Sequence, residues 1–236
     1  MIESILPSCV VSVDLFHDPP DAILYPAEEK LISRSVEQRR REFTTARHCA
    51  RVALRRLGSP AGPILSGERG EPRWPEGVVG SITHCEGYRS AVVGDADRVT
   101  TVGIDAEPNA PMTPGVLEAV SLPEERVTVS VLARTHPHVC WDRLLFSAKE
   151  SVYKAWYPLT RRWLDFEEAR ITVDPDAGVF TARLLVPGPR VDGRPVSTFT
   201  GRWLSGNGLV VTAIVLPAPI PSRRPLPATA AATTAV

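Results

Sequence analysis

The sequence has few cysteines and no long apolar run. The four cysteines, Cys9, Cys49, Cys85 and Cys140, are widely spaced and form no Cys-x-x-Cys or Cys/His pattern. We therefore expect neither a zinc site nor a disulfide framework. No stretch reaches the roughly 18 apolar residues of a membrane span. The first residues lack a basic region and are interrupted by Pro7, Ser8 and Asp14, which argues against a signal peptide. We expect a cytoplasmic protein with no membrane partner.

The chain also lacks an excess of either charge. Lys plus Arg total 27 and Asp plus Glu total 27 in 236 residues. Without a global basic field, we expect no nucleic-acid partner. The arginines are concentrated, however, because residues 34–56 carry eight Arg against two Glu. This segment is either a local anion site or a solvated charged face.

Common catalytic and nucleotide-binding loops are absent as well. The sequence contains no G-x-x-x-x-G-K-[ST], no G-x-G-x-x-G and no G-x-S-x-G. These absences argue against the usual phosphate-binding loops and against a serine hydrolase elbow. The 43% hydrophobic content is ordinary for a globular protein and is enough for a sizeable core.

The periodicity of apolar residues predicts an α+β protein. Long helices are expected over 34–58 and over 139–156, the second ending near Pro158. Strands are expected at 10–15, 78–85, 89–94, 99–107, 169–174, 179–186, 196–204 and 209–216. Each half then has one long helix and three or four strands, which predicts two similar lobes with a seam near 105–116. The Pro/Ala/Thr-rich end, 217–236, is expected to be disordered.

Two acids end the predicted strand 99–107. Asp105 and Glu107 are two apart and so point to one face of a strand. Two neighbouring carboxylates repel each other unless a cation or protons intervene, and Mg²⁺ prefers carboxylate oxygens. The alternative is a solvated strand end.

The segment FSAKESVYKA, residues 146–155, places an acid and a base on one helical face. Glu150 and Lys154 are four apart, and Ser147 falls on the same side. Such a pair can hold a metal ion, take a proton and steady a phosphate. It can also be a surface salt bridge, and Ser147 with Glu150 also fits a helix-capping box.

Several cationic residues suggest an anion site. The loop 67–75 carries Arg69 and Arg73, and SITHC places Ser81, Thr83 and His84 near a strand end. Arg47 and Arg55 lie on nearly the same face of the basic helix, and Arg favours bidentate phosphate recognition. A solvated charged face, or a merely packed histidine, is the alternative. Together with the acids, these residues favour Mg²⁺-assisted reaction of a phosphate ester.

Two of these motifs resemble a known family. VGIDAEP (102–108) and FSAKESVYKAW (146–156) match, without a gap, the patterns G-(I/V)-D-x-E and (W/F)-(S/C/T)-x-K-E-(S/A)-x-x-K of 4′-phosphopantetheinyl transferases. GEPRWPEGVVGSITHCEGY (70–88) resembles the third signature of that family. The resemblance covers roughly 35–216 and is strongest to the larger, two-lobed Sfp-type enzymes and their actinobacterial relatives.

The resemblance implies a fold and an activity. The fold is two similar α/β lobes related by pseudo-twofold symmetry, here 1–107 and 108–216, with the active site in the cleft between them. The activity transfers 4′-phosphopantetheine from coenzyme A to a serine of apo acyl or peptidyl carrier proteins and releases adenosine 3′,5′-bisphosphate. It activates fatty acid, polyketide or nonribosomal peptide synthases, and a monomer is implied. Alternatives are a Mg²⁺-dependent phosphoester hydrolase and a non-catalytic coenzyme A-binding module.

The resemblance also implies residue roles. Mg²⁺, or Mn²⁺ in its place, would be held by Asp105, Glu107 and Glu150. Glu150 would act as general base and Lys154 would stabilise the pyrophosphate, both meeting coenzyme A together with Asp105. Thr83 and His84 would contact its 3′-phosphate side. Further coenzyme A contacts would come from Arg47, Arg55, Gly67, Glu68 and Arg69, with Arg73 as the alternative to Arg69 and Trp163 as a weaker candidate.

Overall fold

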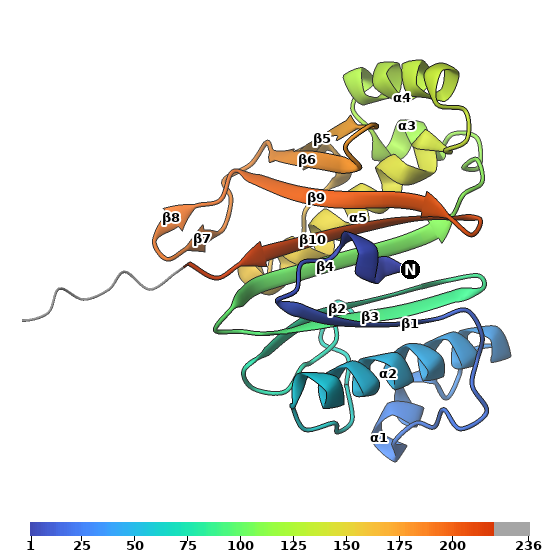
Figure 1. The fold of residues 1–236 in the computed structure, drawn as a ribbon, viewed down its shortest axis with the longest axis vertical. Helices are drawn as coiled ribbons and strands as arrows, with labels where there is room; N and C mark the ends of the chain where they lie inside the picture. The colour runs from blue at the N-terminus through green and yellow to red at the C-terminus, as the bar shows by residue number, and fades with distance from the viewer. Residues whose placement is uncertain (220–236) are drawn as a thin grey trace, which may run out of the picture.

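A small antiparallel sheet and one long helix form the first half of the chain. In a computed structural model, which describes residues 1–219, strands β1 (Val10–Leu15), β3 (Tyr88–Asp95) and β2 (Val78–Cys85) lie in the order β1-β3-β2. The short helices η1 (Ile2–Ile5), α1 (Pro26–Glu29) and η2 (Lys30–Ile32) precede helix α2 (Glu37–Leu57). Figure 1 shows α2 lying across this sheet. Its Cys49, Ala50, Ala53 and Leu54 pack against Val13, Ala91 and Val93.

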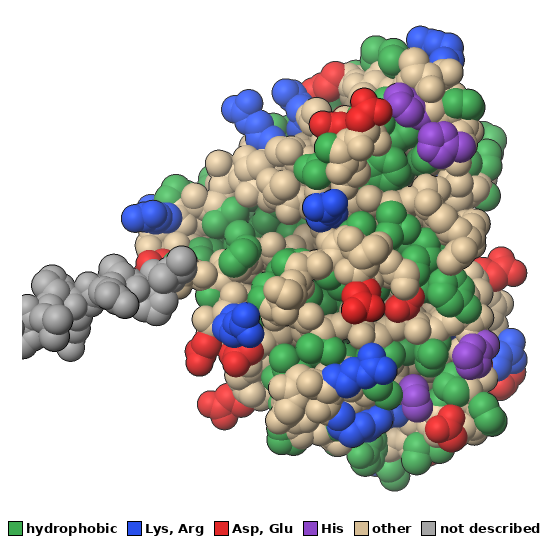
Figure 2. All heavy atoms as spheres, viewed as in Figure 1, with side chains coloured by type: hydrophobic (Ala, Val, Ile, Leu, Met, Phe, Trp, Pro, Cys, Tyr) green, Lys and Arg blue, Asp and Glu red, His purple; other side chains and the backbone are tan. Residues whose placement is uncertain are grey.

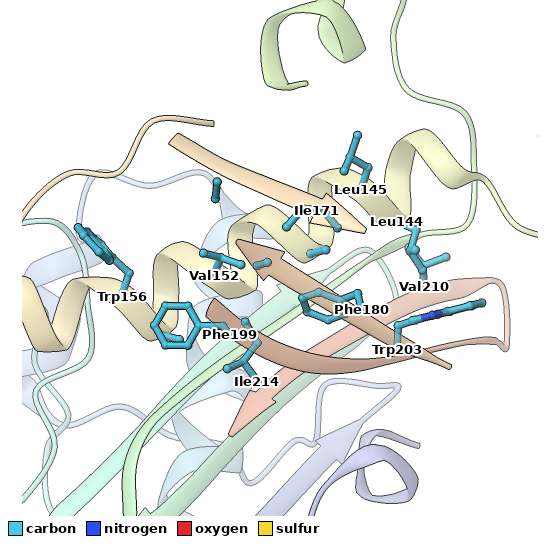
Figure 3. Close-up of a cluster of buried hydrophobic side chains, with 14 of the residues drawn as sticks. Leu144, Leu145, Val152, Trp156, Ile171, Phe180, Phe199, Trp203, Val210 and Ile214 are labelled. Carbon is cyan, nitrogen blue, oxygen red and sulfur yellow. The ribbon is translucent and has the colours of Figure 1, made fainter. Parts of the chain in front are cut away.

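A five-stranded antiparallel sheet forms the second half. Its strands are β4 (Val99–Pro108), β10 (Leu209–Pro217), β9 (Thr198–Gly206), β6 (Val179–Leu184) and β5 (Ala169–Asp174), in that order. Helix α5 (Trp141–Thr160) packs on it, with α3 (Val116–Val120), α4 (Pro123–Thr135) and η3 (Phe166–Glu168) nearby. The short strands β7 (Arg190–Val191) and β8 (Arg194–Pro195) form a separate hairpin. Val152 and Trp156 of α5 belong to one buried cluster with Phe180, Phe199 and Ile214 of the sheet (Figure 3).

The predicted α+β class is confirmed, and most predicted elements are present. Helix α5 differs from the prediction because it continues through Pro158 to Thr160. Proline near the C-terminal end of a helix removes only one backbone hydrogen bond, and the chain leaves the helix at Arg161, in the left-handed conformation with φ 54°. Residues 220–236, most of the tail expected to be disordered, lie outside the described residues.

The division into lobes at residue 107 stays a prediction. Strand β4 belongs to the first predicted lobe, yet its hydrogen-bonded neighbour is β10 of the second. On its other side β4 lies against β2, without joining it in one sheet. The two halves therefore meet along β2 and β4.

Two hydroxyl groups join these strands. Ser81 Oγ accepts a hydrogen bond from the backbone N–H of Ile104 at 3.1 Å, and Thr83 Oγ1 accepts one from Ala106 at 3.0 Å. Ser81 and Thr83 are two apart and so share a face of β2. Because an unpaired buried N–H costs roughly 1–3 kcal/mol, these hydroxyls substitute for the missing ladder bonds.

The surface reflects the balanced composition. Figure 2 shows basic and acidic side chains interspersed over one face, without an extended patch of a single sign. Among the described residues, no helix is both long enough and apolar enough to cross a membrane.

Candidate active site

The two sequence motifs meet where α5 packs on β4. Gly103 permits this contact, because a Cβ atom there would lie 2.0 Å from the Ser151 carbonyl oxygen of α5. One turn beyond Ser151, the Lys154 ammonium donates a hydrogen bond to Asp105 Oδ1 at 2.6 Å. Lys154 therefore pairs with Asp105 of β4 and not with Glu150 of its own helix.

Asp105 has one satisfied and one unsatisfied oxygen. Thr83 Oγ1 donates to its Oδ1 at 3.3 Å, beside the contact from Lys154. Its Oδ2 is buried and has no hydrogen-bond partner. Buried carboxylate oxygens are normally hydrogen-bonded, so an orphaned one points to a missing group.

The other two acids lie within the field of Asp105. Burial and the charge of Asp105 raise the pKa of Glu107 to about 7, against the opposing effect of Arg143. Burial also raises the pKa of Glu150, and Asp105 adds to this while Lys154 opposes it. Crowded, desolvated carboxylates of this kind favour a bound cation.

In this structure, Asp105 and Glu107 form ion pairs with side-chain cations. Asp105 contacts Lys154, and Glu107 Oε2 lies 3.1 Å from Arg143 Nη1. Within residues 1–219, no three His, Cys, Asp or Glu side chains are grouped closely enough to hold a metal ion. The buried, unpartnered Asp105 Oδ2 and the carboxylate chemistry nevertheless fit a hard divalent cation.

The capping interpretation of Ser147 and Glu150 is wrong. Helix α5 begins at Trp141, so Ser147 lies in its interior, one turn or more from the N-terminus. Ser147 is fully buried, and its Oγ lies 2.9 Å from Thr212 Oγ1 of β10. It therefore faces the sheet, away from the cavity that Glu150 and Lys154 line.

A cavity of about 1020 Å³ opens beside these residues. Helix α2, the loop 66–74, strand β2 and helix α5 contribute to its walls. The cavity wall brings together six of the predicted site residues. It also includes Arg73, the predicted alternative to Arg69. These lining residues are Arg47, Glu68, Arg69, Arg73, His84, Glu150 and Lys154.

The structure does not bring the remaining predicted residues to the cavity wall. Thr83 and Asp105 are buried behind it and contact each other. Glu107 is turned toward Arg143, and Gly67 packs against the Glu71 carboxylate, which a Cβ atom would meet at 2.0 Å. Arg55 is exposed in the last turn of α2. The spacing argument placed Arg55 beside Arg47, but eight residues of helix also displace it by more than two turns along the axis.

Arg47 and His84 both line the cavity but differ in charge. Arg47 stacks on the Phe43 ring at 4.2 Å and donates from Nε to the Ile64 carbonyl at 2.9 Å. His84 Nδ1 lies 3.3 Å from Glu42 Oε2, and its Nε2 contacts Arg39. Burial and the Arg39 charge lower the pKa of His84 to about 4. His84 is therefore a neutral hydrogen-bonding group at neutral pH.

Several lining residues were not predicted. Arg39 and Phe43 line the cavity with Arg47. Their spacing of four residues places them on one helix face, so the sequence alone could have predicted them. Tyr153 lies three residues after Glu150 on the same helix face and could have been predicted from that spacing. Its buried hydroxyl has no hydrogen-bond partner. The role of Arg161 could not be predicted from the sequence, because its position depends on the left-handed turn after α5 and on an ion pair with Glu71 at 2.8 Å.

Comparison with known proteins places this geometry in a family. Residues 27–94 match the 4′-phosphopantetheinyl transferase N-terminal domain, and residues 101–195 match the 4′-phosphopantetheinyl transferase superfamily. The chain is 58% identical over 222 residues to the 4′-phosphopantetheinyl transferase Svp of Streptomyces mobaraensis, covering 93% of this chain and 90% of Svp. It is 52% identical to PptT of Mycobacterium tuberculosis, over 92% of this chain and 98% of PptT. It is 54% identical to Npt of Nocardia iowensis, over 91% and 99%.

These matches, together with the α+β fold, define a transferase. The chain belongs to the 4′-phosphopantetheinyl transferase family, and it transfers phosphopantetheine from coenzyme A to carrier proteins. The resemblance inferred from the motifs is confirmed. Family membership also decides against the hydrolase and the non-catalytic coenzyme A-binding module.

Proposed function

We propose that coenzyme A binds in the cavity and that Glu150 and Lys154 carry out the transfer at its inner end. The supporting observation is the Lys154–Asp105 contact beside Glu150 at a cavity large enough for a cofactor of this size. Arg47, Arg69 and Arg73 supply positive charge along the wall for phosphate groups. His84 adds a neutral hydrogen-bonding group near Arg39.

In the proposed reaction, Glu150 takes the proton of the carrier serine hydroxyl. The serine oxygen forms a bond to the β-phosphorus of coenzyme A, and the bond from that phosphorus to the bridging oxygen breaks. Adenosine 3′,5′-bisphosphate leaves with the bonding electrons. Lys154 stabilises the negative charge that grows on the phosphates. The raised pKa of Glu150 supports a role as base, because catalytic bases work best near the operating pH.

Asp105, Glu107 and Glu150 would hold a Mg²⁺ ion, or Mn²⁺ in its place. The fit rests on the buried, unpartnered Asp105 Oδ2 and on the burial and Asp105 charge that raise the pKa of Glu107. When bound, the ion neutralises pyrophosphate charge. Without the ion, Arg143 balances the negative charge of Glu107 and Lys154 balances that of Asp105.

Mass spectrometry of a carrier protein tests the proposal. An apo carrier incubated with the enzyme, coenzyme A and Mg²⁺ should gain about 340 Da, the mass of one phosphopantetheine group. EDTA should stop the gain, and added Mg²⁺ should restore it. Glu150→Gln should abolish the gain while the variant keeps its fold and still binds coenzyme A. Near-normal transfer by Glu150→Gln would overturn the assignment of the base.

The carriers also belong to the proposal. We propose acyl and peptidyl carrier domains of fatty acid, polyketide or nonribosomal peptide synthases as acceptors, and a monomeric enzyme that works in the cytoplasm. A panel of apo carriers assayed in parallel separates these classes. Size-exclusion chromatography with light scattering reports the oligomeric state.

A further inference from the structure

A buried ion pair lies behind the cavity and takes no part in the proposed reaction. Glu28 of α1 is fully buried, and Arg51 of α2 is 6% exposed. Arg51 Nη1 lies 3.0 Å from both carboxylate oxygens of Glu28. Buried charges are costly unless their geometry and hydrogen bonds are complete. The contacts of this pair therefore indicate what it holds in place.

The Glu28 carboxylate also binds two backbone groups. It accepts hydrogen bonds from the N–H of Tyr25 at 2.9 Å and from the N–H of Ile64 at 2.8 Å. Arg51 in turn donates to the carbonyl of Ile23. The bond to Tyr25 closes the first turn of α1, whereas the bond to Ile64 reaches 36 residues along the chain, into the loop that follows α2.

Ile64 connects this pair to the cavity. Its N–H is bound by Glu28, and its carbonyl oxygen accepts the hydrogen bond from Arg47 Nε at 2.9 Å. Arg47 Nη2 also lies 3.4 Å from Ser66 Oγ, two residues further along the same loop. Glu28 thus fixes the residue that orients the Arg47 guanidinium.

Charge reinforces the connection. Arg47 and Arg51 are four apart on α2, so their like charges are neighbours on one helix face. Burial lowers the pKa of Arg47 to about 10, the Glu28 charge opposes this, and Arg51 adds to it. The negative charge of Glu28 therefore compensates the positive charges of both arginines, although Arg51 is the only one of the two that it contacts.

We propose that Glu28 and Arg51 are positioning residues for the coenzyme A site. They fix Ile64, and through Ile64 they hold the Arg47 guanidinium at the cavity wall, ready to meet a phosphate group. The inference rests on the proposed binding of coenzyme A in this cavity. Neither residue lines the cavity, so their contribution is orientation.

The test uses the full chain and a matched control. Glu28→Gln removes the charge of the buried acid, and Glu29→Gln makes the same change at the exposed neighbouring residue of α1. Isothermal titration with coenzyme A gives Kd, and carrier modification gives KM and kcat, at a temperature where circular dichroism shows every variant folded. Arg47→Ala and Glu28→Gln/Arg47→Ala complete a double-mutant cycle.

Glu28→Gln should raise Kd and KM for coenzyme A about tenfold or more, with kcat at saturating coenzyme A changed by less than about twofold. Glu29→Gln should leave Kd, KM and kcat unchanged. In the Arg47→Ala background, Glu28→Gln should change Kd no further. If Glu28→Gln does not fold, Glu28→Leu/Arg51→Met, which has no buried charge, should show the same loss of affinity and the same dependence on Arg47.

Two results would overturn the positioning role and leave the proposed coenzyme A site in place. One is an unchanged Kd in folded Glu28→Gln when Arg47→Ala does weaken binding. The other is an equal loss with and without the Arg47 side chain, which marks a general structural effect. Unchanged binding by Arg47→Ala would instead remove the proposed coenzyme A site at this wall, and the positioning role with it.

Discussion

Lys154 Nζ of helix α5 lies 2.6 Å from Asp105 Oδ1 of strand β4. This contact joins the two sequence motifs through residues that are 49 positions apart. It also leaves Asp105 Oδ2 buried and without a partner. Lys154 thus contacts Asp105 and also lines the cavity, and in the proposed function it exchanges this partner for a phosphate group.

Replacing Lys154 tests this role. Lys154→Ala should lower phosphopantetheine transfer at least about tenfold, because a cation that balances transition-state charge is lost. Loss of the partner of buried Asp105 should also cost about 1–3 kcal/mol of unfolding free energy. Carrier modification measured by mass and urea unfolding check the two effects, with exposed Lys30→Ala as the control. Transfer at the wild-type rate would show that Lys154 only balances charge in the folded protein.

Gly103 should be intolerant of a side chain. In Gly103→Ala, the new Cβ meets the Ser151 carbonyl oxygen and, at 2.7 Å, the Ala155 nitrogen, which forces α5 away from β4. Overpacking of this kind costs about 1–3 kcal/mol, and Lys154 should move away from Asp105, which lowers transfer. Gly62→Ala, where a Cβ meets nothing within 4 Å, is the control. Equal melting temperatures for the two variants would contradict the prediction.

Thr83 should matter for stability through its hydroxyl. Thr83→Val keeps the shape but leaves the Ala106 N–H without its acceptor and Asp105 without one of its donors. We expect a loss of about 1–3 kcal/mol in chemical unfolding, whereas Thr83→Ser should stay close to wild type. If Val and Ser variants unfold alike, the hydroxyl does not join β2 to β4 energetically.

His84 should make the folded protein sensitive to acid. Its pKa is about 4 in the folded state and 6.5 ordinarily, so between these values the unfolded chain binds the proton more tightly. Acidification from pH 6.5 to 4 therefore destabilises the folded state, by up to about 1.4 kcal/mol for each pKa unit of difference. His84→Gln should show a smaller decrease of melting temperature over this range than wild type. Exposed His17→Gln is the control and should keep the wild-type slope. A wild-type slope in His84→Gln would refute the assignment.

The sequence by itself determined the class of the protein. The predicted strands β1, β2, β4 and β5 lie within one residue of their observed bounds. Weak alternation of apolar residues indicated β1, a turn signal indicated β2 as part of a hairpin, and a run of β-branched residues indicated β4. The D-x-E and K-E-x-x-x-K motifs indicated the family, because both match its signature patterns without a gap. Arg47, Glu68, Arg69 and His84, which the sequence predicted to contact coenzyme A, line the cavity, and their contact with coenzyme A stays a prediction.

Tertiary structure decided which of these residues meet. Helical periodicity put Glu150 beside Lys154, but the packing of α5 on Gly103 paired Lys154 with Asp105. Periodicity also put Ser147 on the cavity side, but the hydroxyl of Thr212, 65 residues away in sequence, binds it to the sheet. Local spacing fixes directions around one helix axis, whereas a partner from another element depends on long-range packing that no single segment encodes. For the same reason, only the assembled fold connects Glu28 to Arg47 through Ile64.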